Sequence, residues 1–302
     1  MIKNVGLVGV GAMGEPMGES LLRAGFAVRI CAHRNREAVV RLVAQGALEN
    51  ANPADVAAGS DLVITVVPDA PQVEESLFGP TGVALGLHED GIVVDMSTIS
   101  PVASRAFHER LETQNLRMLD APVSGGPARA KAGTLTIMVG GEPQTFARAE
   151  PVLRAMGTPT HVGAAGMGET FKLVNQIIIA NIMLADAEGL VFAKKAGADI
   201  DLLRKVLATA TASNYLLEQW LPKAWFADRH RGGFALDLLR KDLAAALDAA
   251  AAASVPLPST ALAYERYSEA ASLGLGRLDY SAVAELLERA ASVSVAQDPV
   301  TP

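Results

Sequence analysis

The chain has 302 residues, of which 50% are hydrophobic and 20% are charged, and its formal net charge is −7. This composition supports a sizeable core and is typical of a globular protein with one large or two ordinary domains. The acidic balance and the lack of a basic run argue against nucleic acid as a partner. The single cysteine, Cys31, excludes an intrachain disulfide and fits a reducing compartment, so we expect a cytoplasmic protein.

Short β-type runs alternate with helical patterns over the first half of the chain. Helices are expected in between, and the last of these begins with Ser100 as N-cap and Pro101 at its first position. This β-α-β alternation predicts α/β architecture: a doubly wound Rossmann-type domain over residues 1–163, with a parallel sheet and right-handed crossovers. The predicted strands span 3–11, 26–33, 61–68, 91–98, 117–123 and 135–141, and the predicted helices 15–25, 36–46 and 100–114.

The second half carries only helical patterns, which predict an all-helical domain over residues 164–293. Its first helix is about 28 residues long, or roughly 40 Å, and is expected to join the two domains. Charged and amide residues interrupt this apolar helix, so we expect it to be buried rather than to span a membrane. Residues 294–302 have no helical period and are expected to be disordered. The predicted helices span 168–196, 200–211, 213–221, 235–254, 258–273 and 279–292.

The sequence GVGAMG at residues 9–14 is a G-x-G-x-x-G motif that follows a strand and opens a helix. Gly9 suits the tight turn, Gly11 allows a pyrophosphate to approach the backbone, and Gly14 allows close packing of helix on strand. With Ala12 and Met13, these glycines are predicted to bind a dinucleotide at the helix N-terminus. The alternative is a glycine-rich turn without a ligand.

The end of the second strand indicates which dinucleotide binds. An NAD site usually has an acid there, about 20 residues after the motif, whereas this chain has His33, Arg34, Asn35 and Arg36. Arginine suits a 2′-phosphate through forked hydrogen bonds, so we expect NADP to be preferred over NAD. The alternative is that these are solvated loop charges and that either cofactor is accepted.

Two further strand ends are expected to line the cofactor cleft, because ligands of open α/β sheets bind beyond the carboxyl ends of the strands. The third strand ends in Val67, Pro68 and Asp69, and the fourth in a segment that contains Thr98. Thr98 also lies just before a helix start, where Ser and Thr residues serve as caps. Both roles are compatible.

The turn Ser124-Gly125-Gly126 follows a later strand. A hydroxyl and backbone amides in such a turn can hold a small anion such as a carboxylate. The alternative is a tight turn closed by Pro127, and the turn alone does not decide between the two.

Lys172 lies in the otherwise apolar helix that opens the second half of the chain. Helical spacing places Gly168, Lys172, Asn175 and Gln176 on one face. A partly desolvated lysine has a lowered pKa and can exchange a proton near neutral pH. Alternatively, the stem covers apolar surface while the amine reaches water. The spacing leaves both interpretations open.

Other chemistries find little support in the sequence. The five histidines are scattered without metal-ligand spacing, so no metal is expected. There is no G-x-S-x-G motif for a serine nucleophile. Trp220 and Trp225 are expected to pack, although an aromatic side chain near the cleft could shape a substrate pocket. Lys241 on its own is typical of a solvated helix charge.

Five motifs in this order resemble the β-hydroxyacid dehydrogenase family, which includes 3-hydroxyisobutyrate dehydrogenase, tartronate semialdehyde reductase and glyoxylate/succinic semialdehyde reductases. The similarity covers nearly the whole chain except its tail. The chain departs from the family pattern in the residues that end its second strand and in having Gln176 where many members have a second asparagine. The motifs are GLVGVGAMGEPM, DMSTISP, DAPVSGGPARAKAGTLTIMVGG, GMGETFKLVNQ and the KDL at 241–243.

The resemblance implies a role for each matching residue. Lys172 matches the catalytic lysine, and Asn175 together with Ser124, Gly125 and Gly126 matches the residues that hold the substrate. Thr98 and Lys241 match cofactor contacts. The resemblance also implies a homodimer or homotetramer built through the helical domain.

We therefore expect an NADP-preferring oxidoreductase that interconverts small 3-hydroxy acids and their semialdehydes or oxo acids by hydride transfer, with Lys172 as general acid and base. The expected partner is a small carboxylate, with neither nucleic acid nor membrane. One alternative is an imine reductase on the same scaffold, although such relatives usually lack the lysine. The other is a non-catalytic dinucleotide-binding protein, which typically loses the lysine and gains extra domains.

Overall fold

The computed structural model describes residues 2–33 and 35–296. Its contacts divide the chain into two units, Met1–Leu173 and Val174–Pro302. The division falls later than the predicted boundary at residue 163. The reason is that the start of the long helix, up to Leu173, belongs to the contacts of the first unit.

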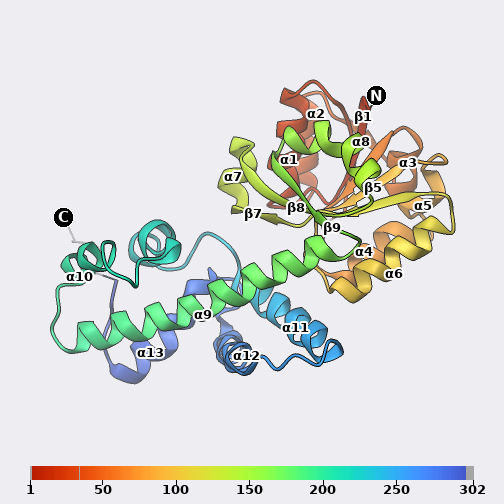
Figure 1. Cartoon of the computed structure of the whole chain (residues 1–302). Helices are drawn as coiled ribbons and strands as arrows, with labels where there is room; N and C mark the ends of the chain where they lie inside the picture. Colours follow the sequence, from red (N-terminus) through yellow and green to blue (C-terminus); the bar gives the residue numbers. More distant parts are fainter. Residues whose placement is uncertain (1, 34, 297–302) are drawn as a thin grey trace. The chain divides into compact units, whose positions relative to one another are not determined.

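Nine strands within the described residues form one sheet, in the order β3-β2-β1-β4-β5-β6-β8-β7, with β9 paired to β8 (Figure 1). The pairs from β3 to β6 are all parallel, as the alternating pattern predicted. The strands are β1 (Asn4–Val8), β2 (Ala27–Cys31), β3 (Leu48–Asn50), β4 (Leu62–Thr65), β5 (Ile92–Asp95), β6 (Arg117–Asp120), β7 (Val123–Ser124), β8 (Leu135–Gly141) and β9 (Gly157–Gly163).

The expectation of an entirely parallel sheet is wrong at one side. Strand β8 runs antiparallel to both β6 and β7. Only Ala121 and Pro122 separate β6 from β7, so these two strands keep one direction, and the chain reverses through the next helix before β8. A strand pattern in a sequence does not carry the direction of the strand.

Helices pack on both faces of this sheet. Because side chains of a strand alternate between faces, Ile64 joins one buried cluster with Met17, while its neighbour Val63 joins the opposite cluster with Leu77. This double coverage explains the nearly continuous apolar run of β4. The helices are α1 (Gly14–Arg23), α2 (Arg36–Ala44), α3 (Pro53–Ala58), α4 (Ala70–Phe78), α5 (Val83–Gly86), α6 (Pro101–Glu112), α7 (Gly126–Ala132) and α8 (Pro143–Arg154).

The predicted start of α6 is confirmed. The Ser100 side chain accepts a hydrogen bond from the backbone N–H of Val102 at 3.2 Å, and Pro101 is the first residue of the helix. Ser100, rather than Thr98, is therefore the cap of this helix.

The second unit is helical, as predicted. Its core surrounds Trp225 and Tyr267, both fully buried. Trp220 stacks on Tyr280 at 5.7 Å and donates a hydrogen bond to Asp279 at 3.1 Å, so both tryptophans pack as expected. The helices are α9 (Met167–Lys195), which begins in the first unit, α10 (Ile200–Leu207), η1 (Leu216–Trp220), η2 (Pro222–Ala227), α11 (Leu236–Ala252), α12 (Pro258–Ala270), η3 (Ala271–Leu275), η4 (Tyr280–Val283) and α13 (Ala284–Ala291).

The predicted disordered tail begins too early. Val295 is buried, and its backbone N–H donates to the Glu288 carboxylate at 2.6 Å. Ala296 is buried as well, so the packed chain extends at least to this residue. Hydrogen bonding to a side chain on α13, rather than helical periodicity, holds this segment.

Helix α9 differs from the expected buried helix. It is long and apolar enough to cross a membrane by length and composition, and only 33% of its most apolar window is buried. Phe171, Val174 and Ile178 are each about half exposed and follow one another at helical spacing. The chain therefore covers one face of α9 and leaves an apolar stripe on another.

Candidate active site

The glycine turn between β1 and α1 has the geometry that its motif predicts. Gly9 has a φ of 106°, and a Cβ there would lie 2.2 Å from the carbonyl oxygen of Val66. A Cβ at Gly14 would lie 1.9 Å from the carbonyl oxygen of Gly9, whereas one at Gly11 would meet nothing within 4 Å. The first and last glycines thus close the turn, and the middle one borders open space, as the motif predicts.

The residues just before α1 are accessible. Gly11 and Ala12 are exposed, and Met13 is half-buried. Glu15, in the first turn, is bound by the Arg41 guanidinium at 2.5 Å, and this hydrogen bond holds the pKa of its carboxyl below the usual range. Arg41 thereby offsets the one acidic group that would repel a phosphate at this helix N-terminus.

Buried hydrogen bonds join the ends of β4 and β5. The Val67 N–H donates to the Ser97 hydroxyl at 3.0 Å, and this hydroxyl donates to Asp95 at 2.7 Å. Thr65 donates to the same carboxylate oxygen at 2.8 Å. Asp95 is fully buried, and burial raises the pKa of its carboxyl. The network fixes the two loops that carry the predicted cofactor contacts Val67 and Thr98.

Pro68 and Asp69 complete the loop after β4. Pro68 is exposed, while the Asp69 carboxylate accepts the backbone N–H of Ala70 at 2.8 Å and caps α4. Its charge is thus directed to the helix start. The glycine turn lies beside this loop, because the Val66 N–H donates to the Val8 carbonyl at 2.9 Å.

The predicted selectivity residues follow β2. His33 is exposed, and Asn35 caps α2 by accepting the Ala38 N–H at 3.2 Å. Arg34 lies outside the described residues. A capping role for Asn35 explains its identity without a ligand.

The Ser124-Gly125-Gly126 turn joins β7 to α7. Gly125 and Gly126 have φ angles of 133° and 65°, which residues with a side chain rarely adopt. Helix α7 then packs on α1, where the Ser20 hydroxyl donates to the Ala130 carbonyl at 3.1 Å. The turn that was predicted to hold a carboxylate therefore leads directly into a helix that contacts the helix of the glycine motif.

Lys172 lies on α9, and only 6% of its surface is exposed. A lysine whose stem merely covers apolar surface keeps its amine in water and is rarely so buried. The burial therefore argues against the interpretation in which the amine only reaches water.

Two predicted residues of the second unit belong to one buried network. The Asn175 amide donates to Gln176 at 2.9 Å, and Gln176 donates to Asp242 at 2.6 Å. The Lys241 ammonium lies 2.7 Å from the other Asp242 oxygen. Gln176, the departure from the family pattern, thus has a partner in Asp242 and orients Asn175, and Lys241 is not a simple solvated charge.

Asp95, Asp120 and Asp242 were not singled out from the sequence. Each is at most 1% exposed and accepts hydrogen bonds from residues near the predicted site. The only sequence signal was an acidic residue at the end of an apolar strand or inside the KDL motif. No group of three or more potential metal ligands occurs in the described parts of the chain.

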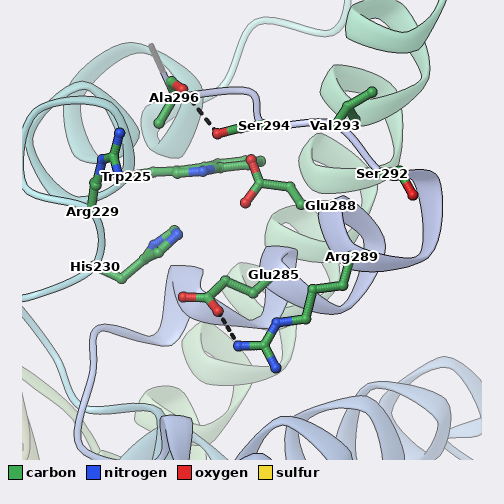
Figure 2. A pocket seen from close by; sticks show the side chains of 10 residues that line it. All are labelled: Trp225, Arg229, His230, Glu285, Glu288, Arg289, Ser292, Val293, Ser294 and Ala296. Atoms are coloured by element: carbon green, nitrogen blue, oxygen red, sulfur yellow. Dashed lines mark hydrogen bonds and ion pairs between the residues drawn. The ribbon is translucent and has the colours of Figure 1, made fainter. Parts of the chain in front are cut away.

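A cavity of about 460 Å³ lies in the second unit and contains none of the predicted site residues. Figure 2 shows that Trp225, His230 and Glu288 face it. Burial raises the pKa of the Glu288 carboxyl and lowers that of His230 to about 4. The His230 Nδ1 pairs with the Ser281 hydroxyl at 2.7 Å. This cavity is built around a neutral histidine.

We expect His230 to make the protein sensitive to mild acid. The folded pKa of about 4 lies below the ordinary value of 6.5, so the neutral ring contributes stability above pH 6.5 that is lost as pH falls toward 4. Between about pH 7 and about pH 4.5 this loss amounts to about 2–3 kcal/mol. His230→Asn, which tolerates the φ of 65° there, removes this part of the loss.

Urea unfolding of both proteins at the two pH values measures the effect. Buried carboxylates titrate in wild type and variant alike, so the difference between the two isolates the histidine. Equal losses of unfolding free energy in both proteins would contradict the prediction.

Two family models together match nearly the whole chain. The NAD-binding domain of 6-phosphogluconate dehydrogenase matches residues 4–169. The NAD-binding region of NADP-dependent 3-hydroxyisobutyrate dehydrogenase matches residues 166–287.

Characterised proteins are similar over almost their full length. The chain is 39% identical to 2-(hydroxymethyl)glutarate dehydrogenase of Eubacterium barkeri, covering 96% of this chain and 97% of the relative. It is 38% identical to 2-hydroxy-3-oxopropionate reductase of Escherichia coli, covering 97% and 99%. The structure of Mycobacterium tuberculosis 3-hydroxyisobutyrate dehydrogenase with L-serine superposes with a TM-score of 0.87 at 33% identity, covering 95% and 99%.

Proposed function

Because this chain belongs to the β-hydroxyacid dehydrogenase family, we propose that it is an NADP-preferring enzyme in which Lys172 transfers the proton. It is an NAD(P)-dependent oxidoreductase that interconverts hydroxy acids and semialdehydes. The observation that supports the role of Lys172 is its burial on α9. The same chain carries an open glycine cradle, which is the turn from Gly9 to Gly14.

We propose that the Ser124-Gly125-Gly126 turn holds the carboxylate of the substrate. The Ser124 hydroxyl and the backbone amides of Gly125 and Gly126 are donors. The two glycines place no side chain between the backbone and the anion. Asn175, oriented by Gln176, is proposed as a further donor to the substrate. Binding the substrate at its carboxylate orients the carbinol carbon for reaction.

Bound NAD(P) supplies or accepts the hydride, and its phosphates would lie at Gly9, Gly11, Ala12, Met13 and Gly14. In the direction of oxidation, neutral Lys172 takes the hydroxyl proton. In reduction, the Lys172 ammonium gives a proton to the carbonyl oxygen. Such a positioned acid or base contributes about 10²–10⁴-fold to the rate.

The preference for NADP is proposed from Arg34, which the sequence places at the end of the second strand. Val67, Pro68, Asp69, Thr98 and Lys241 remain predicted cofactor contacts, as do His33 and Asn35. We expect Arg34→Ala to weaken NADP binding by about 10- to 100-fold, the worth of a charge-assisted hydrogen bond to phosphate. NAD binding is expected to change by less than about twofold, since NAD has no 2′-phosphate.

The dissociation constants of NADP and NAD, measured by fluorescence titration or calorimetry, test this selectivity. Arg36→Ala is the matched control, because the Arg36 guanidinium is paired with Glu49. An Arg34→Ala variant that loses affinity for both cofactors equally would contradict the NADP preference.

We propose a cytoplasmic homodimer or homotetramer. The apolar stripe of α9 at Phe171, Val174 and Ile178 is the kind of surface that a second copy buries. Light scattering on the purified protein gives the mass of the assembly, and a monomer at micromolar concentration would contradict this part of the proposal.

A spectrophotometric screen of the nicotinamide absorbance tests the function as a whole. The panel contains hydroxy acids, semialdehydes and cyclic imines, each with NAD and NADP. Turnover of hydroxy acids or semialdehydes with NADP supports the proposal. Turnover of imines alone, or cofactor binding without any turnover, would replace it with one of the two alternatives.

A further inference from the structure

Helix α9 begins on a buried carboxylate of strand β6. Asp120 is fully buried. Its Oδ1 accepts the backbone N–H of Gly166 at 2.8 Å, and its Oδ2 accepts that of Glu169 at 3.0 Å. The first N–H groups of a helix lack partners within the helix. Asp120 therefore caps α9 from another element, and its charge suits the positive end of the helix dipole.

Two glycines make this contact possible. A Cβ at Gly168 would lie 2.5 Å from the carbonyl oxygens of both Asp120 and Met138. A Cβ at Gly140 would lie 2.7 Å from both carboxylate oxygens of Asp120. Gly168 thus allows the helix backbone to approach β6 and β8 closely. This contact fixes the first turn of α9 on the sheet.

The same turn is also tied to the loop after β5. Glu169 is fully buried, and its carboxylate accepts the backbone N–H of Ile99 at 3.1 Å. The His108 Nε2 of α6 lies 3.2 Å from Asp120 Oδ1, the oxygen that also accepts the Gly166 N–H.

We propose that Asp120 is a positioning residue that sets where Lys172 presents its amine. This inference rests on the proposed function, in which Lys172 transfers the proton. Lys172 follows Glu169 by three residues, or about 4.5 Å along the helix axis. The intervening turn is regular helix, so a shift of the capped turn carries Lys172 with it. A displacement of about 1 Å at a reacting group costs about 100-fold in rate.

Asp120→Asn tests this inference because it preserves shape and removes one of the two acceptors. The amide N–H₂ then faces a backbone N–H, and the first turn of α9 loses a contact. We expect kcat to fall by about 10- to 100-fold, whereas the KM for the hydroxy acid and the cofactor Kd change by less than about threefold. A general loosening of the fold would move all three quantities together.

Hydrogen exchange of the Gly166 and Glu169 amides gives a readout that does not depend on activity. Both amides are expected to be protected in the wild type and to exchange faster in Asp120→Asn. Unprotected amides in the wild type would overturn the proposal. If Asp120→Asn does not fold, Gly168→Ala displaces the same turn and is expected to give the same selective loss of kcat. Its Cβ would lie 2.5 Å from the Asp120 and Met138 carbonyl oxygens and 2.8 Å from Asp120 Oδ2.

His108→Gln is the matched control, since it alters the other neighbour of Asp120 and leaves both helix contacts in place. Its kcat is expected to stay within about twofold of the wild type. A loss as large as that of Asp120→Asn would show that the effect does not run through α9.

The outcomes separate this inference from the proposed function. Full activity in Lys172→Ala would remove the proposed proton donor and the positioning role with it, while the exchange data still report the cap. An inactive Lys172→Ala together with a wild-type kcat in Asp120→Asn would overturn the positioning role alone.

Discussion

Lys172→Ala is expected to lose turnover by about 10²–10⁴-fold, the usual contribution of a positioned acid or base. The cofactor affinity is expected to survive, because the contacts that form the glycine cradle do not include Lys172. Steady-state kinetics and cofactor titration on the same preparation measure the two quantities.

One further variant and one rescue experiment separate proton transfer from charge. Lys172→Arg retains the positive charge but stays protonated near neutral pH, so it is expected to be as inactive as Lys172→Ala. A small primary amine added to Lys172→Ala is expected to restore part of the turnover, because it supplies the missing acid. Lys194→Ala, on the last turn of the same helix, is the control and keeps wild-type turnover. Wild-type activity in Lys172→Ala would contradict the assignment of Lys172 as the proton-transferring group.

Gly14→Ala is expected to lower the free energy of unfolding by about 2 kcal/mol or more and to abolish cofactor binding. The added Cβ would lie 1.9 Å from the Gly9 carbonyl oxygen and 3.0 Å from a Val66 side-chain carbon. A backbone oxygen cannot rotate away, so α1 must move off β1, and the turn that holds the phosphates moves with it. Urea unfolding and cofactor titration measure both effects.

Gly11→Ala is the matched variant in the same turn. A Cβ there meets nothing within 4 Å, so the free energy of unfolding should stay within about 0.5 kcal/mol of the wild type. The methyl group nevertheless occupies space proposed for the pyrophosphate, and the cofactor affinity should fall about tenfold or more. Normal cofactor binding by Gly11→Ala would place the phosphates elsewhere.

The elements around the glycine turn were predictable because their causes are local. A strand followed at once by a turn and a helix requires tight packing at Gly9 and Gly14 and open space at Gly11, and the structure has both. The cap at Ser100 and the break before Pro258 are likewise set by a few neighbouring residues. Neither the direction of β8 nor the exposed stripe of α9 has such a local cause.

The buried carboxylates could not be assigned, because their partners are remote in the chain. Asp95 accepts a hydrogen bond from Thr65, which lies 30 residues away in the sequence. Asp120 accepts one from the N–H of Gly166, which lies 46 residues away. Gln176 meets Asp242 across 66 residues. Residues at such separations become neighbours only through the order of strands in the sheet and the packing of helices.

By itself, the sequence determined the Rossmann-type domain, the helical domain after it, the glycine turn and the family, because hydrophobic period, turn chemistry and motif spacing are properties of short segments. The tertiary structure decided that Asp120 caps α9, that Gln176 pairs with Asp242 and that β8 reverses. It also decided that Lys172 is buried rather than exposed. The physical reason is common to all of these: burial and hydrogen-bond partners depend on which distant segments the fold brings into contact.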